Sequence, residues 1–262
     1  LYSLWDIRAG NVRYRDWLSL RKKESNNICN GAIYFFKSLG TNKMWTSNDE
    51  FTNDYFIGRY RTWICRCRPN SLCNRRFCVL RAIGGTSIYT ASDNIIAKKI
   101  AQNVIDNKDL NYVRLDRHPT ENIFYDKNKF NFQDGFRILG KYSENKNVII
   151  SHGRILSNCI KTINELSDNF YLVDLFRSKP ISKKLIDLIK DSKKVIVVDE
   201  QTQYGNLTSA VQSELSKYEL FPFIKNISLP DEYVFQNGGR DFLLKKYNLD
   251  ELSILNFCKK IL

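Results

Sequence analysis

One stretch of the chain, Lys194–Val211, limits the possible folds more than any other: KVIVVDEQTQYGNLTSAV. It begins with four β-branched residues, Val195–Val198, the pattern of a strand buried on both faces of a parallel sheet. Asp199 and Glu200 are expected just past the carboxyl end of this strand, at the edge where open α/β sheets place their ligands. Gly205 allows a tight turn, and the apolar spacing after it predicts a helix. Taken alone, such a unit is most often structural, with a solvated acidic loop.

The C-terminal half alternates between short apolar runs and amphipathic segments. Strands are expected at residues 148–150, 171–175, 195–198 and 223–227, and helices follow them after short connections. Ser182 and Asp250 are the expected caps of two of these helices. Such alternation predicts an α/β fold with parallel sheets covered by helices, and residues 141–262 are expected to form one intact domain. His152 follows the first of these strands, and we expect a structural role for it.

The segment before this domain carries a smaller α/β pattern. Strands are expected at residues 87–90 and 112–115, with a helix between them that begins at Ser92 or Asp93. Residues 121–140 have the composition of an extended linker. We therefore expect residues 79–140 to be the remainder of a second domain and its linker.

Composition divides the chain near Cys78. The net charge is +13, and residues 1–78 hold 14 Lys and Arg against 6 Asp and Glu, a net charge of +8. The same 78 residues contain all four tryptophans and five of the seven cysteines, but no persistent helical or strand periodicity. A basic arm for nucleic acid and a zinc site among these cysteines are both weak interpretations, because the cysteine spacing departs from the usual pairs.

Four segments resemble the transketolase family. Lys194–Val211 is similar to a family strand followed by an acidic pair, a glycine turn and an "lgsaV" helix start, although Tyr204 stands where a second glycine is common. VLRAIGGTSIYTASD, from Val79 on, resembles "lRaipgitvytPsD" of the pyrimidine-binding domain. Asp116-Arg117 ends a strand similar to "yiRlsRq", and LPDE, from Leu229 on, resembles "gipDef".

In that family a "GpTHhaiEDia" motif directly precedes the "lRaip" segment, whereas here CRCRPNSLCNRRFC stands in its place. Read one nucleotide later, the codons from Arg61 to Val79 permit the string EHGFAGAGPTHYATEDFA. The same shift permits FGISEQEMLGIA onward from Leu4, which has the form of the family's "GisEQ" motif. We therefore hypothesise that residues 1–78 are a pyrimidine-binding domain translated out of frame and poorly folded. A different but genuine N-terminal segment is the alternative.

The resemblance implies a thiamine diphosphate-dependent enzyme with Mg²⁺ as the second cofactor, transferring a two-carbon unit between sugar phosphates. Because no "GDG" followed by asparagine is present, the diphosphate-binding half is expected to be a separate chain, the N-terminal transketolase section, in a homo- or heterodimer. Arg117 matches the arginine that binds the sugar phosphate, although an ion pair with Asp116 would also explain it. His118 is expected at the surface. No catalytic or metal-binding residue is assigned.

As translated, the chain lacks the family's cofactor glutamate and its histidine-containing loop, so we expect it to be inactive and its cofactor binding to be doubtful. A pyruvate dehydrogenase beta or deoxyxylulose-phosphate synthase type of subunit is one alternative, and a non-enzymatic binding or dimerisation module is another. No secretory signal or membrane-length apolar run is visible, which predicts a cytoplasmic protein. Since the first residue is Leu1, we expect a fragment or a non-standard start codon.

Overall fold

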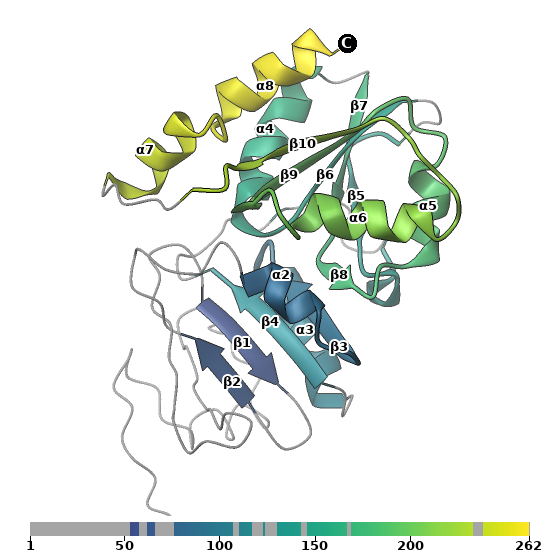
Figure 1. The fold of residues 1–262 in the computed structure, drawn as a ribbon, viewed down its shortest axis with the longest axis vertical. Coiled ribbons are helices and arrows are strands. Elements are labelled where there is room, and N and C mark those ends of the chain that lie inside the picture. Colours follow the sequence, from purple (N-terminus) through teal and green to yellow (C-terminus); the bar gives the residue numbers. More distant parts are fainter. Residues whose placement is uncertain are drawn as a thin grey trace, which may run out of the picture.

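The computed structural model describes residues 53–57, 62–65, 76–106, 110–116, 123, 130–142, 146–166, 169–232 and 238–261, with the backbone alone at 53–57, 62–65, 76, 79 and 110. Two sheets organise these residues into an upper and a lower lobe in Figure 1. The expected α/β class is confirmed.

The lower sheet contains five strands in the order β2-β1-β4-β3-β8. Its parallel pair is β3 with β4; β1 pairs antiparallel with β4, β8 antiparallel with β3, and β2 antiparallel with β1. The bounds of its strands and helices are β1 Asn53–Ile57, β2 Thr62–Cys65, α2 Arg76–Arg81, β3 Thr86–Thr90, α3 Asn94–Asp106, β4 Leu110–Leu115 and β8 Arg177–Lys179. Strands β1 and β2 fall in the segment for which the shifted frame predicts no stable fold, and most of that segment lies outside the described residues.

The upper sheet runs in the order β10-β9-β6-β7-β5, with β5 alone antiparallel. Its strands are β5 Arg137–Leu139, β6 Asn147–Ser151, β7 Phe170–Asp174, β9 Val195–Thr202 and β10 Ile224–Leu229. Its helices are η4 Gly153–Ile155, α4 Leu156–Leu166, α5 Lys183–Ile189, α6 Leu207–Ser216, α7 Gly239–Lys246 and α8 Glu251–Lys260, and the short η3 Phe132–Asp134 precedes β5. Figure 1 shows α4, α7 and α8 on one face and α5 and α6 on the other.

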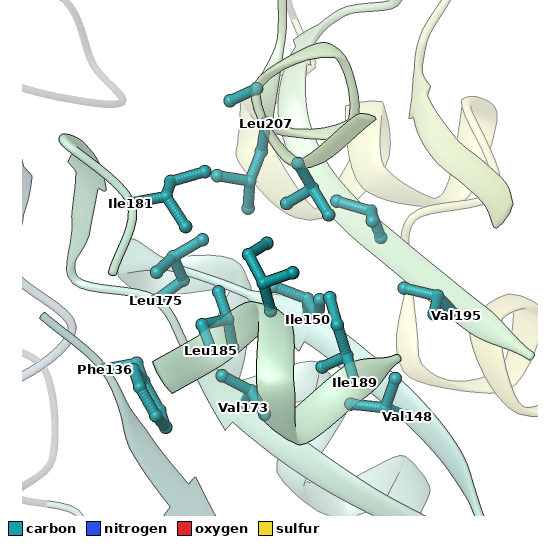
Figure 2. Packing of buried hydrophobic residues seen from close by; sticks show 14 of the residues in the cluster. Phe136, Val148, Ile150, Val173, Leu175, Ile181, Leu185, Ile189, Val195 and Leu207 are labelled. Carbon is teal, nitrogen blue, oxygen red and sulfur yellow. The ribbon is translucent and has the colours of Figure 1, made fainter. Parts of the chain in front are cut away.

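The central strands have no solvent-facing side, which explains their uninterrupted apolar sequences. All four residues Val195–Val198 are 0% exposed, and their side chains alternate between two hydrophobic clusters. Figure 2 shows one cluster, in which Val148, Ile150, Val173 and Val195 of the sheet face residues of α5 and the start of α6. Strand β9, between β10 and β6, is therefore an interior strand buried on both faces, as its sequence predicts.

The two lobes exchange strands. Strand β5 precedes residue 141 yet belongs to the upper sheet, whereas β8 follows it and pairs with β3 of the lower sheet. The cluster in Figure 2 also continues across the junction, because Phe77, Ile88 and Tyr112 of the lower lobe belong to it. Hydrophobic burial therefore joins the lobes as well as filling each one.

Candidate functional site at the junction of the two sheets

The carboxyl ends of strands from both sheets face each other across the lobe junction. The Gly153 amide, after β6, donates to Ser92 Oγ, after β3, at 3.1 Å, and the Thr90 amide donates to the Phe176 carbonyl at 2.8 Å. An open α/β sheet presents this edge to ligands. Here the lower sheet covers it.

One guanidinium occupies the centre of this junction. Arg137, on β5, places Nη2 2.9 Å from Asp93 Oδ2 and Nε 2.9 Å from Asp174 Oδ2. The Arg137 side chain is 5% exposed and both carboxylates are 0% exposed. Asp93 comes from the lower lobe and Asp174 ends β7 of the upper one, so Arg137 links the two lobes.

Neighbouring groups satisfy the remaining oxygens of both carboxylates. Ser92 Oγ donates to Asp174 Oδ1 at 2.5 Å. Asp93 Oδ1 accepts from the Ile96 amide at 2.8 Å and thereby caps α3, while Oδ2 also accepts from the Ile123 amide. Burial raises the pKa of Asp174 above its ordinary value, against the opposing effects of Arg137 and Ser92.

A second set of polar side chains, centred on His152, joins the two lobes across the junction. Its Nε2 lies 3.2 Å from Asp199 Oδ1 on β9 and 3.5 Å from Arg114 Nη1 on β4. Because a carboxylate only accepts and a guanidinium only donates, the shorter contact indicates that the Nε2–H of His152 donates to Asp199. His152 is 1% exposed, and the edge of its ring system packs against Phe77 of α2 with ring centroids 5.7 Å apart. The structural role expected for His152 agrees with this burial.

Asp199 remains ionised in this buried position. Its Oδ2 accepts from the Leu207 amide at the start of α6, at 3.0 Å. Burial by itself raises its pKa, but His152 first, and then Arg114 and the Leu207 amide, outweigh that effect and hold the pKa below the ordinary value of 3.8.

The position expected for the acidic pair was wrong. Asp199 and Glu200 lie within β9, which continues to Thr202, and not in a solvated loop beyond it. Asp199 is 0% exposed, and Glu200 forms an ion pair with Arg240 of α7. Both carboxylates therefore join elements of the fold instead of facing an open ligand site.

The glycine turn after β9 receives helix α2 of the lower lobe. Gly205 has a φ of +71°, and a Cβ atom there would overlap the Cys78 side chain. Arg81 Nη1 donates to the carbonyls of Gly205 and Asn206 at 3.1 and 3.3 Å. The turn is a docking site for α2.

Arg117, the expected phosphate-binding residue, lies outside the described residues, as does His118. The structure describes the residue before it, Asp116, whose Oδ1 is 3.5 Å from Arg154 Nη1. Arg154 belongs to η4 of the upper lobe and its side chain is 27% exposed. The end of β4 is thus held by a residue from the other lobe.

The residues that join the lobes were not identified as a group from the sequence. Asp93 was expected only as a helix cap, and Arg137, Asp174 and Arg114 were not singled out. Their common sequence signal is a polar residue within or just after an apolar strand. This signal marks the junction edge, but it does not show which residues pair.

The described residues offer no ready-made site for a metal ion. Among the described residues, no three His, Cys, Asp or Glu side chains gather as a metal site. The carboxylates at the junction are already engaged by Arg137 and His152. None of the helices that the structure describes combines the length and apolar character needed to cross a bilayer.

Comparison with protein families supports the sequence resemblance. Residues 140–254 match the family model described as the transketolase C-terminal domain. A protein of Methanocaldococcus jannaschii, named as a transketolase C-terminal section, is 27% identical over 180 residues, which cover 67% of this chain and 55% of that protein. A 1-deoxy-D-xylulose-5-phosphate synthase of Pseudoalteromonas translucida is 31% identical over 115 residues, or 44% of this chain and 18% of the synthase. The matched region thus spans about half of the first relative and less than a fifth of the second.

Solved transketolase structures share the fold. A split-gene transketolase, described as an inactive beta4 tetramer, superposes with a TM-score of 0.58 at 19% identity and covers 70% of this chain and 60% of that one. The transketolase of Pichia stipitis in complex with sedoheptulose 7-phosphate gives a TM-score of 0.53 at 12% identity, covering 70% of this chain and 26% of that one. At these identities the likeness concerns the fold alone.

Proposed function

We propose that this chain, whose residues 140–254 form a transketolase C-terminal domain, is the C-terminal section of a split thiamine diphosphate-dependent, transketolase-like enzyme. The observation that carries the proposal is the attachment of this domain, through the lobe junction, to the β3–α3–β4 unit with its transketolase-like strand ends. The match to a relative that is itself a C-terminal section supports the split arrangement.

The roles that we propose for the two sections of the enzyme follow from the residues that this chain contains. A separate N-terminal section would bind the diphosphate and Mg²⁺; among the described residues no three His, Cys, Asp or Glu side chains gather as a metal site. This chain would contribute Arg117, which follows β4 by two residues in the sequence; a planar guanidinium suits a sugar phosphate because it can donate two parallel hydrogen bonds. The proposed reaction is ketol transfer between sugar phosphates, by a homo- or heterodimer of sections.

We further propose that the chain is inactive as translated, because residues 1–78 are read in a shifted frame. The two family motifs permitted in that frame support this, as does their order along the chain. Sequencing the gene around the codons for Phe77 to Val79 tests it directly. Codons that cannot encode the GPTH-type motif in the shifted frame would exclude the hypothesis.

Activity measurements separate the frame hypothesis from the family proposal. The chain and a frame-restored version would each be mixed with the N-terminal section, thiamine diphosphate, Mg²⁺ and a ketose phosphate. We expect two-carbon transfer with the restored chain and none with the original. Transfer by the original chain would refute inactivity, and failure of the restored chain would count against the transketolase assignment.

Two other functions have specific support. The match to deoxyxylulose-phosphate synthases favours a synthase-type subunit, so the restored chain should also be assayed for formation of deoxyxylulose phosphate. The beta4 tetramer described for the split-gene relative favours a retained association module. Light scattering of the full chain would show whether it assembles without an N-terminal section.

A further inference from the structure

We propose that Arg137 is a positioning residue, which couples the front unit, defined as residues 76–106 and 110–116, to the C-terminal domain and so fixes the end of β4. This inference concerns how the two lobes move relative to one another. It holds whether or not the chain is part of an enzyme, because none of its steps requires a substrate or cofactor.

The geometry places one cation between two carboxylates from different lobes. Arg137 contacts Asp93 of the front unit and Asp174 of the upper sheet at the same distance, 2.9 Å. Arg137 and Asp174 are also opposite one another in the β5–β7 register, so the upper sheet fixes the guanidinium before Asp93 is added. Asp93 is then the partner that brings the front unit into place.

Removing the guanidinium would leave two carboxyl groups facing each other without a cation. Both side chains are 0% exposed, so neither can be hydrated while the junction is closed. One carboxyl can take up a proton, but the other would remain a buried charge without its partner, which is strongly unfavourable. Water reaches both groups when the front unit separates from the upper sheet. The expected response is therefore separation and local unfolding of the front unit, which loses the shared packing of Phe77, Ile88 and Tyr112, while the upper sheet stays folded.

Other contacts keep the molecule folded when Arg137 is changed. Strand β8 pairs with β3, and Phe77 is buried in the cluster shared by both lobes. Lys179 Nζ donates to the carbonyls of Arg81 and Ile83 at the end of α2, at 2.7 and 2.6 Å. These contacts link the lobes along a different side of the front unit, and they contain no buried charge that would need hydration.

The test uses the full chain and hydrogen–deuterium exchange resolved by residue. In Arg137→Met we expect amides of β3, β4 and the first turn of α3 to exchange about 100-fold faster, the scale expected for a buried charge left without its partner. Amides of β6 and β9 should keep their rates. The matched control is Lys161→Met, because Lys161 forms an exposed ion pair with Glu251 and should leave both groups of amides unchanged.

A rescue variant separates charge from packing. Arg137→Met combined with Asp93→Asn and Asp174→Asn removes all three charges, while the amide oxygens still accept from Ile96 and Ser92. We expect this triple variant to recover most of the protection of β3 and β4. Equal acceleration in both sheets of Arg137→Met, no acceleration, or no rescue would each overturn the proposal. If Arg137→Met does not fold, folding of the triple variant supports the proposal and its failure to fold refutes it.

Discussion

At Gly153 the backbone after β6 comes close to the end of β3 in the other lobe. Its φ is +66°, and a Cβ atom there would lie 2.9 Å from Thr90 Cγ2, closer than packed carbon atoms approach. We expect Gly153→Ala to lower the free energy of unfolding by about 1–3 kcal/mol, from backbone strain and from overlap with Thr90. Urea denaturation followed by circular dichroism would measure the loss.

A double variant identifies the contact responsible. Thr90→Ser removes the methyl group that an alanine at position 153 would meet, so the double variant should recover part of the lost stability. Gly84 is the matched control, since a Cβ atom there would meet nothing within 4 Å and its φ is not in the left-handed range. Equal losses for Gly84→Ala and Gly153→Ala would show that close packing at the junction is not the cause.

The buried Asp199 gives the junction a specific dependence on pH. Its pKa lies below 3.8 in the folded chain because His152, Arg114 and the Leu207 amide outweigh the effect of burial. A lowered pKa stabilises the fold at pH values above the unfolded pKa, and this contribution disappears as the pH falls through the folded pKa.

Asp199→Asn should therefore be less stable than the original chain at pH 7, by about 1–3 kcal/mol for the lost charge-assisted hydrogen bonds. The difference should stay constant down to about pH 5 and shrink at lower pH. Urea denaturation of both proteins from pH 7 to pH 3 would show this. A difference that grows as the pH falls would contradict the assigned direction of the pKa shift.

Among the elements, helix α6 is capped at its start by the side chain of Asn206. Asn206 Oδ1 accepts from the Ser209 amide at 3.2 Å, and its Nδ2 donates to Asn226 Oδ1 on β10. Asn206→Ala removes both bonds and should lower the free energy of unfolding by about 1–2 kcal/mol. Asn206→Asp keeps the cap but loses the bond to β10. In urea denaturation its stability should therefore fall between that of the original chain and that of Asn206→Ala. Equal losses for alanine and aspartate would assign the whole effect to Asn226.

The longer elements could be predicted from the sequence because their local pattern and their final environment agree. The apolar run at 195–198 predicts a strand buried on both faces, and the structure places it inside the sheet, between β10 and β6. Ser182 caps α5 as expected. The cap expected at Asp250 differs, because Asp250 begins α8 without a side-chain bond to the helix backbone and instead accepts from Ser253 Oγ.

The three-residue strands β5 and β8 could not be predicted in the same way. Residues 137–139 fall within the linker expected at 121–140, and no strand is expected at residues 177–179. Each becomes a strand only by pairing antiparallel with a partner already placed by the rest of the fold. Three residues are too few to show a periodicity, so their structure is decided by tertiary contacts.

The junction residues were missed for a related reason. Arg137 lies 44 residues from Asp93 and 37 from Asp174, and His152 lies 47 residues from Asp199. A single sequence indicates which residues are polar at strand ends, but the pairing depends on how the two sheets face each other. The acidic pair was placed wrongly because β9 continues four residues beyond its apolar run, to Thr202.

At the scale of the whole molecule, the exchange of strands makes the two lobes parts of one structure (Figure 1). The lower sheet needs β8, which follows the upper lobe's β7 in sequence, and the upper sheet needs β5, which precedes its other strands. The front unit thus lacks the edge strand β8 without the C-terminal part of the chain, which carries both β5 and β8. The C-terminal domain and the front unit should for this reason remain associated even where the chain between them is cut.

Limited proteolysis of the full chain with trypsin would test this association together with the shifted-frame hypothesis. Residues 1–78 contain 14 Lys and Arg, and the hypothesis gives them no selected core, so we expect early cleavage there. Cleavage between β4 and β5, at Arg117, Lys127 or Lys129, should leave two pieces that elute together in native size-exclusion chromatography. Mass spectrometry of that peak should find both pieces, because β8, Phe77 and Arg137 hold them without a covalent link.

Separate elution of the two pieces would show that the contacts at the junction are too weak to hold the lobes together. Survival of residues 1–75 as a protease-resistant fragment would show a genuine folded domain and end the shifted-frame hypothesis.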